Sequence, residues 1–288
     1  MDLPNLPARS GGSPQPGSLE AVEIDLLLEG VFRHYGYDFR DYARSSLRRR
    51  LRHLMLNHGL TSISDLTEKV LHDPEWLDRL LAAFSINVSA MFRDPSFYRA
   101  FRETVVPILR TYPFVRIWHA GCSTGEEAYS TAILLHEAGL YDRCRIYATD
   151  MNEHVLRKAR DGIFPLTAMK AYTANYIQAG GTTAFSEYYT AQYDSAIFRP
   201  WLKRNIVFAQ HNLAMDTSFN ELHAIVCRNV MIYFNRALQN RVLDLFSASL
   251  VRLGFLCLGN KESLKGTNGE AAYDVVSADE RIYRKVRG

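Results

Sequence analysis

The 288-residue chain has few cysteines and no long apolar run, and these shortages exclude several classes of protein. Its cysteines lack metal-ligand spacing, and three of the four fall in apolar, strand-like segments (Cys122, Cys144, Cys227, Cys257). We therefore expect reduced thiols in a reducing compartment and no metal site. No window approaches the roughly 20 apolar residues of a membrane-spanning helix, and residues 1–18 lack the apolar core of a signal peptide. The composition predicts a cytoplasmic protein without membrane insertion.

The chain also has little excess of charge of either sign. The formal net charge is +3, which is too mild to argue for nucleic acid as a partner. Hydrophobic residues make up 47% of the chain, enough for a sizeable core and for one large or two modest domains.

The first part of the chain has helical periodicity throughout. Residues 1–18 have the composition of a disordered tail, and a small helical domain is expected over 19–84. Four amphipathic segments begin near Val22, Leu47, Ile63 and Trp76. Breaks are expected at 57–59 and 72–74, where Gly and Pro occur.

A linker loop over 85–98 leads into an α/β domain over 99–288. Asp94-Pro95 can cap and start a helix through Phe97–Leu109. Strands are expected at 115–120, 145–149, 206–209, 223–227 and 254–258, with helices between most of them. This alternation predicts a Rossmann-like, mostly parallel sheet, which the segment Tyr273–Val286 could close as an antiparallel edge.

One stretch, at about 163–205, is too long for a simple crossover between two strands. It is rich in aromatic residues and contains Gly180-Gly181. We interpret it as an inserted antiparallel β-subdomain, with a helix near 167–178 followed by short strands.

The turn after the first strand indicates the ligand. Small residues from Gly121 to Gly125 let the backbone approach a ligand closely, and Asp150 ends the next strand, where an acid can accept hydrogen bonds from ribose hydroxyls. The full G-x-G-x-x-G spacing is absent, and Glu126 and Glu127 would repel the pyrophosphate of a dinucleotide. A dehydrogenase is therefore excluded. A ligand with a ribose, a cationic centre and an ammonium group fits, and S-adenosylmethionine has all three.

Each of these residues also has an ordinary structural interpretation. Asp150 could cap a helix over 152–160, and the glycines could be plain turn residues. A first-turn acid favoured by the helix dipole would explain Glu126 better than Glu127.

Polar residues follow two later strands at the same edge of the sheet. Asn212 and Leu213 come after the strand at 206–209, where an amide can pair with the adenine edge and an aliphatic side chain can cover its face. Arg228 and Asn229 follow a wholly apolar strand, a poor arrangement for stability and a common place for a functional polar pair. Asn212 could instead satisfy the backbone of its own loop.

Several blocks together resemble the chemotaxis receptor methyltransferase (CheR) family. They are Asn87-Val-Ser89, FRD at 92–94, GCSTGEEAYS at 121–130, ATD at 148–150, HNL at 211–213 and CRNVMIYF at 227–234. The resemblance runs from about residue 20 to the C-terminus. It implies S-adenosylmethionine-dependent methylation of glutamate side chains on chemoreceptors, giving γ-glutamyl methyl esters and S-adenosylhomocysteine.

The resemblance also implies roles for residues of the linker and of the insertion. In the family the linker covers the cofactor, which makes Asn87, Ser89 and Arg93 candidate contacts and favours Glu127 as the acceptor for the methionine ammonium group. The family usually has Thr at position 89 and Phe at 91, where this chain has Ser89 and Met91. The β-subdomain of the family can bind a receptor C-terminal peptide by strand addition.

The implied reaction needs little catalytic machinery. A glutamate with a pKa of about 4.3 is already ionised at neutral pH, so no general base is required. Positioning for in-line displacement and desolvation of the carboxylate remain to be supplied. Arg93 and the Tyr233 hydroxyl are the candidates for holding the carboxylate, although Arg93 could pair with Asp94 and Tyr233 could be a core residue.

An arginine cluster in the helical domain is the candidate docking surface. Helical spacing puts Arg44, Arg48 and Arg52 on one face, with Arg49 close by and only Asp41 opposing them. Arginine suits carboxylate recognition, and the resemblance implies acidic receptor helices as the partner, with a plain solvated face as the alternative. Two other functions stay open: methylation of another protein or small molecule, and a non-catalytic scaffold that binds the cofactor.

Overall fold

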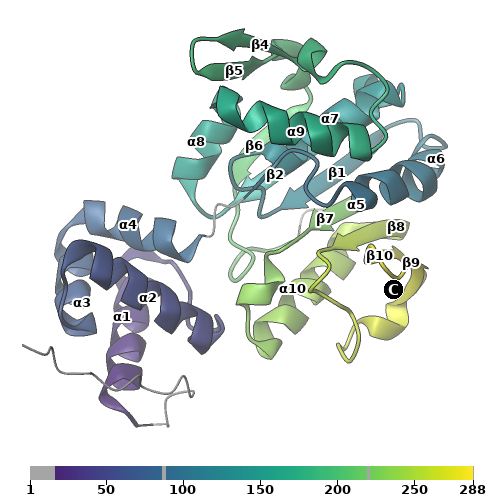
Figure 1. Ribbon diagram of the computed structural model, residues 1–288. Helices are drawn as coiled ribbons and strands as arrows, with labels where there is room; N and C mark the ends of the chain where they lie inside the picture. Colours follow the sequence, from purple (N-terminus) through teal and green to yellow (C-terminus); the bar gives the residue numbers. More distant parts are fainter. Residues whose placement is uncertain (1–16, 86–88, 219–220, 288) are drawn as a thin grey trace, which may run out of the picture. The chain divides into compact units, whose positions relative to one another are not determined.

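A computed structural model describes residues 17–85, 89–218 and 221–287, and the chain divides into two compact units between Phe84 and Ser85 (Figure 1). None of the described helices is long and apolar enough to cross a membrane. The predicted contact residue Asn87 lies outside the described residues.

The first unit consists of helices, as predicted. They are α1 (Leu19–Tyr35), α2 (Arg44–His58), α3 (Ile63–His72) and α4 (Pro74–Phe84). Gly59, with φ 66°, ends α2, and a capping box between Ser62 and Asp65 starts α3. The apolar faces of the four helices meet in one core, in which Leu27, Leu51 and Leu66 are fully buried.

The arginines of α2 have more acidic partners than the sequence indicated. Arg44 pairs with Asp25 at 2.5 Å, and Arg48 and Arg52 both pair with Glu20, at 3.8 Å and 2.9 Å. The expectation that only Asp41 opposes this cluster is therefore wrong. Helix α1 supplies the acids, because folding brings its charged face beside α2.

Arg49 and Arg50 differ in their surroundings. Arg49 is exposed. Arg50 is buried and donates to the carbonyl of Phe84, so it belongs to the interior of the unit.

The second unit is built on a seven-stranded sheet in the order β6-β2-β1-β7-β8-β10-β9. Its strands are β1 (Val115–Ala120), β2 (Cys144–Asp150), β6 (Ile206–Gln210), β7 (Leu222–Cys227), β8 (Leu250–Leu258), β9 (Tyr273–Ser277) and β10 (Ile282–Lys285). The first five are parallel, and β10 runs antiparallel to both β8 and β9. The Rossmann-like prediction is confirmed, and the closing edge is a hairpin of two strands.

Helices cover both faces of the sheet (Figure 1). Helix α7 (Glu126–Glu137) packs on the face that carries Ile117, and α10 (Arg236–Ser249) packs on the opposite face, where Phe246 contacts Trp118. Helix α8 (Glu153–Asp161) follows β2. The predicted helix before β1 is present in three pieces: α5 (Pro95–Ala100), a π-helical turn (Phe101–Val105) and α6 (Val106–Leu109).

The insertion contains a separate three-stranded antiparallel sheet in the order β3-β5-β4. Its elements are β3 (Ile163–Pro165), α9 (Met169–Gln178), β4 (Tyr189–Gln192) and β5 (Ser195–Phe198). The helix is where it was predicted, but one strand precedes it.

Glu137 joins this insertion to the core. The Glu137 side chain is 2% exposed and accepts from Arg102 at 2.7 Å, from the Thr182 backbone at 3.0 Å and from the hydroxyls of Tyr176 and Tyr188.

All four cysteines are free and buried in this second unit. Three of them lie in strands, Cys144 in β2, Cys227 in β7 and Cys257 in β8, as the apolar runs predicted. Burial raises the pKa of the Cys144 thiol to about 12.

Candidate functional site

The predicted site lies where the order of strands in the sheet reverses. Strand β1 has β2 on one side and β7 on the other, and all three run parallel, so their carboxyl ends meet at one edge. Gly121, Asp150 and Arg228 stand at or directly after these three ends. Open α/β sheets bind ligands in the crevice at such a switch point.

The glycine turn after β1 is attached to the end of β2. The backbone N–H groups of Gly121 and Cys122 both donate to the Thr149 carbonyl at 2.8 Å, and that of Ser123 donates to the Asp150 carboxylate at 2.9 Å. Gly121 has φ 81° and Gly125 has φ 94°, in the left-handed region that favours glycine. The turn therefore needs glycine for its own conformation, whatever it binds.

Asp150 is half-buried, and burial raises the pKa of its carboxyl although backbone donors at Asn152 and Ser123 lower it in part. Its second oxygen accepts from the Asn152 backbone at 3.0 Å. The residue that caps α8 is Asn152, whose side chain accepts from the His154 backbone at 2.9 Å. The helix-cap interpretation of Asp150 is therefore wrong, and the carboxylate holds the glycine turn.

Glu127 is the centre of a buried charged cluster, which we call the Glu127 cluster and which consists of Asp94, His119, Glu127 and Arg228. His119 Nδ1 lies 2.9 Å from one Glu127 oxygen, and Arg228 donates to the other at 3.3 Å. Burial raises the pKa of Glu127, but the His119 hydrogen bond and the charges of His119 and Arg228 outweigh this and lower it overall. The carboxylate is held ionised with 19% of the side chain exposed.

Arg228 is the cation of this cluster, with only 1% of its side chain exposed. Its guanidinium donates to Asp94 at 2.6 Å and to the Arg93 carbonyl at 3.2 Å, and it lies 4.1 Å from the centre of the Phe97 ring. Arg228 thus joins the end of β7 to the linker loop. In this structure it contacts Glu127 and Asp94, so it orients acids at the site.

Asp94 has a different role from the one predicted. It occupies the N-cap position of α5 with φ 55°, and its side chain accepts no cap hydrogen bond from that helix. Its carboxylate pairs with Arg228, 134 residues further along the chain. This long-range ion pair competes successfully with the local cap because it neutralises a buried guanidinium.

Glu126 is also more than a first-turn acid. It is 5% exposed, and both its oxygens accept from the Thr124 hydroxyl, at 2.7 Å and 2.9 Å. Burial raises the pKa of Glu126, while hydrogen bonds from Thr124 and Ser89 lower it in part. The predicted contact Ser89 therefore links the linker loop to the start of α7.

The residues after β6 lie next to Asp150, since the His211 backbone donates to the Asp150 carbonyl at 3.1 Å. The Asn212 side-chain oxygen accepts from the Ala214 backbone at 3.0 Å, and Leu213 is 8% exposed. Asn212 thus satisfies its own loop, as the structural interpretation had it, while its loop lies at the predicted edge.

Arg93, Asn229 and Tyr233 are each partly exposed at the same edge of the sheet. Asn229 has φ 61°, a left-handed conformation that is uncommon for a residue other than glycine. Tyr233 ends a short 3-10 turn, Met231–Tyr233.

Sequence reasoning missed His119 and Glu262. His119 lies on the same face of β1 as the buried Val115 and Ile117, four and two residues before it. The period of two in a strand therefore already predicted a titratable side chain in the core. Glu262 follows β8 at the carboxyl edge, and the reasoning that selected Asp150 applies to it as well.

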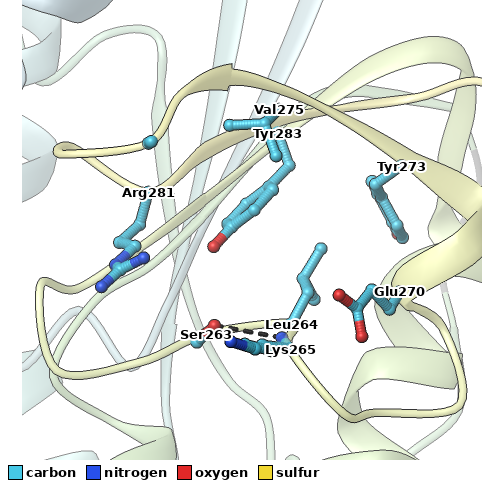
Figure 2. A pocket seen from close by; sticks show the side chains of 9 residues that line it. Ser263, Leu264, Lys265, Glu270, Tyr273, Val275, Arg281 and Tyr283 are labelled. Atoms are coloured by element: carbon cyan, nitrogen blue, oxygen red, sulfur yellow. Dashed lines mark hydrogen bonds between the residues drawn. The ribbon is translucent and has the colours of Figure 1, made fainter.

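A cavity of about 200 Å³ lies elsewhere, beside the β9–β10 hairpin. Figure 2 shows Lys265, Glu270, Arg281 and Tyr283 around it. None of the predicted site residues lines it. Within the described ranges, no group of three or more His, Cys, Asp or Glu side chains could hold a metal ion.

The chemistry of the site fits S-adenosylmethionine. Glu127 presents a partly exposed anion suited to an ammonium group, and Asp150 presents one at the strand end suited to ribose hydroxyls. Two buried polar atoms of the site have no hydrogen-bond partner among the described residues: His119 Nε2 and Arg228 Nε. A polar ligand or water would satisfy such atoms.

Comparisons with known proteins agree with this geometry. The family model for the CheR methyltransferase SAM-binding domain matches residues 87–281, and that for the CheR all-alpha domain matches residues 23–85.

Three curated relatives match over most of their own length. Cher3 of Pseudomonas putida, provisionally named a methyltransferase, is 48% identical over 92% of this chain and 97% of its own. A chemotaxis protein methyltransferase of Salmonella typhimurium is 32% identical over 78% of this chain and 76% of its own. A chemotaxis protein methyltransferase of Escherichia coli is 27% identical over 85% of this chain and 86% of its own.

Proposed function

This chain belongs to the CheR methyltransferase family, and on that premise we propose that it is a protein-glutamate O-methyltransferase of chemoreceptors. S-adenosylmethionine is its cofactor. The products would be γ-glutamyl methyl esters and S-adenosylhomocysteine, and the place of action would be the cytoplasm. The observation that carries the proposal is the similarity to chemotaxis protein methyltransferases across both units of the chain.

The charges of the site support an anionic acceptor. The cofactor supplies a methyl group on a positively charged sulfur, and a glutamate carboxylate can attack it without a general base. In the Glu127 cluster the carboxylates of Glu127 and Asp94 are both paired with Arg228 or His119, so neither carboxylate is offered as a base. What the protein must then provide is placement and removal of water.

We assign roles to the remaining residues on the same basis. Asp150 would hold the ribose, Glu127 the ammonium group, and Asn212 with Leu213 the adenine. Gly121, Asn87, Ser89 and Asn229 would surround the cofactor, with Arg228 keeping Glu127 in place. Arg93 and Tyr233 would hold the acceptor carboxylate, since both are partly exposed at the edge where these groups gather.

Receptor docking is proposed at the α2 arginines, Arg44, Arg48, Arg49 and Arg52. Exposed ion pairs contribute only about 0–1 kcal/mol each, so an acidic receptor helix can replace Asp25 or Glu20 as partner of Arg44 and Arg52, which are 46% and 59% exposed. Arg49 is the cleanest test, because substituting it breaks none of these α1–α2 pairs. Arg49→Glu should raise the KM for receptor and leave cofactor affinity unchanged, whereas a change in both would contradict a docking role.

A second receptor contact is proposed at the β-subdomain. Strand β4 is an edge strand of the three-stranded sheet, with three exposed residues, and a receptor C-terminal peptide could extend that sheet as a further strand.

The proposal is tested by methyl transfer. Labelled S-adenosylmethionine is incubated with the protein and membranes that contain the cognate receptors, and the product is treated with alkali. Label that enters the receptors and is released as methanol supports a carboxyl ester. Cofactor binding without transfer contradicts the receptor assignment and leaves another acceptor or a scaffold.

A further inference from the structure

Glu262 is a buried acid to which the reaction described above gives no role. It follows β8 at the carboxyl edge of the sheet and is 5% exposed. Among the described residues no basic group forms an ion pair with it. Burial raises the pKa of its carboxyl, which shows that the site is costly for an anion, so its contacts need an explanation.

Four backbone N–H groups converge on this one carboxylate. One oxygen accepts from Val230 at 2.9 Å and Ile232 at 3.3 Å. The other accepts from Asn229 at 3.0 Å and from Gly259 at 2.7 Å. Successive N–H groups of a tight turn form a concave anion-binding nest, and here a side chain of the same protein fills it.

The turn that forms this nest, residues 228–233, is strained in a way that the carboxylate can maintain. Asn229 is left-handed at φ 61°, and its N–H donates to Glu262. Gly259 leaves the necessary room, because a Cβ there would lie 2.8 Å from both the Asn229 nitrogen and the Glu262 carboxylate. A larger residue at 259 would push the two partners apart.

The same turn contacts both halves of the cofactor site. The Val230 side chain packs against Gly121, where a Cβ would come within 2.5 Å of it. Arg228 begins the turn and donates to Glu127. Displacement of the turn would therefore move the glycine loop and the Glu127 cluster together.

We propose that Glu262 is a positioning residue, which holds the 228–233 turn in the geometry that binds the cofactor. It acts through the backbone of Asn229, Val230 and Ile232 and touches neither cofactor nor acceptor. The inference rests on the assignment of this turn to the cofactor site under the proposed function.

The test measures S-adenosylhomocysteine affinity by calorimetry on the full chain, well below the thermal unfolding midpoint of every variant. Glu262→Gln replaces one acceptor oxygen by an N–H donor that faces two of the backbone N–H groups. The dissociation constant is expected to rise about tenfold or more, as for loss of a hydrogen bond to a charged group. An affinity equal to that of the wild type in the folded variant overturns the proposal.

Two controls separate positioning from general stability. Glu270→Gln changes an exposed acid of the same segment, which accepts one backbone N–H from Gly266 and lines the cavity of Figure 2, and it should leave affinity unchanged. Glu137→Gln should lower the unfolding midpoint and leave affinity unchanged, because Glu137 joins α7 to the insertion. If Glu137→Gln weakens binding as much as Glu262→Gln, the effect is stability alone and the proposal fails.

A measurement on the wild type covers the case in which Glu262→Gln does not fold. Hydrogen exchange of the Asn229, Val230 and Ile232 amides without ligand should be slowed to the rates of β7. Exchange at the rate of an open loop would overturn the proposal. Wild-type binding of S-adenosylhomocysteine without receptor methylation would refute only the proposed function, since this test needs no acceptor.

Discussion

Replacing Gly121 by alanine tests how closely the glycine loop and the 228–233 turn are packed. An added Cβ would lie 2.5 Å from one Val230 methyl carbon and 3.3 Å from the other. The backbone at Gly121 is also left-handed, with φ 81°. Gly121→Ala is therefore expected to lower the free energy of unfolding for two separate reasons, the left-handed backbone conformation and the close contact with Val230.

The structure supplies a control for each cost. Gly139 has φ 68° and nothing within 4 Å of an added Cβ, so Gly139→Ala should show the conformational cost alone, about 1–2 kcal/mol. Overpacking typically adds about 1–3 kcal/mol, so Gly121→Ala should lower the free energy of unfolding by about 2–5 kcal/mol. Both glycines lie in the second unit, so the two changes are compared in one transition.

Val230→Ala should relieve the contact, because the Val230 Cβ lies 3.5 Å from the added atom, an ordinary van der Waals distance. In a double-mutant cycle by guanidinium chloride unfolding, the two substitutions together should cost about 1–3 kcal/mol less than their sum. Equal costs for Gly121→Ala and Gly139→Ala, with no coupling to Val230, would refute the packing argument.

Further predictions concern the cofactor and the insertion. Asp150→Ala should abolish S-adenosylhomocysteine binding while circular dichroism stays native, because the carboxylate holds the glycine turn and is proposed to hold the ribose; unchanged calorimetric affinity would contradict the assignment. Since burial raises the pKa of Asp150 above 3.8 and the ionised form is the acceptor, affinity should fall as pH drops through that raised pKa; an affinity that stays constant down to pH 3.8 would argue against it. Glu137→Gln should cost about 2–4 kcal/mol, because Arg102 loses its buried partner. Burial raises the pKa of Glu137, but hydrogen bonds from Tyr176, Thr182 and Arg102 lower it overall, so its stabilisation is full above pH 4.5 and lost as pH falls through the folded-state pKa. The gap in stability between wild type and variant should therefore narrow in acid, and a gap that widens would be inconsistent with this sign.

The elements of the sheet were readable from the sequence because each strand is a short apolar run between polar turns. Strand β1 has the predicted bounds, and β7 begins one residue early. Strand β8 begins at Leu250, four residues before the prediction, and Arg252 and Leu253 in its first part are exposed. This first part of β8 is held by pairing, as Leu250 with Leu222 of β7, which single-sequence periodicity does not report.

Only those site residues could be predicted from the sequence that stand at the end of a predicted strand or directly after it. Asp150 and Arg228 follow buried strands, so topology alone places them at one edge. The partner of Arg228 could not be foreseen, because Asp94 lies 134 residues away in the chain and makes this ion pair in place of a cap hydrogen bond. The same holds for Glu20 and Asp25, which pair with the α2 arginines only once α1 and α2 are packed. The roles of these residues in binding and catalysis remain predictions.

The burial of every cysteine makes this chain its own reporter of unfolding. All four thiols lie in the second unit and the first has none, so a thiol reagent added to the native protein should label almost nothing. Labelling during a denaturant pulse would then measure the opening of the cofactor-binding unit alone, while far-UV circular dichroism follows both units together. The stability of the cofactor-binding unit can thus be measured in the intact chain, without a truncation and without an introduced probe.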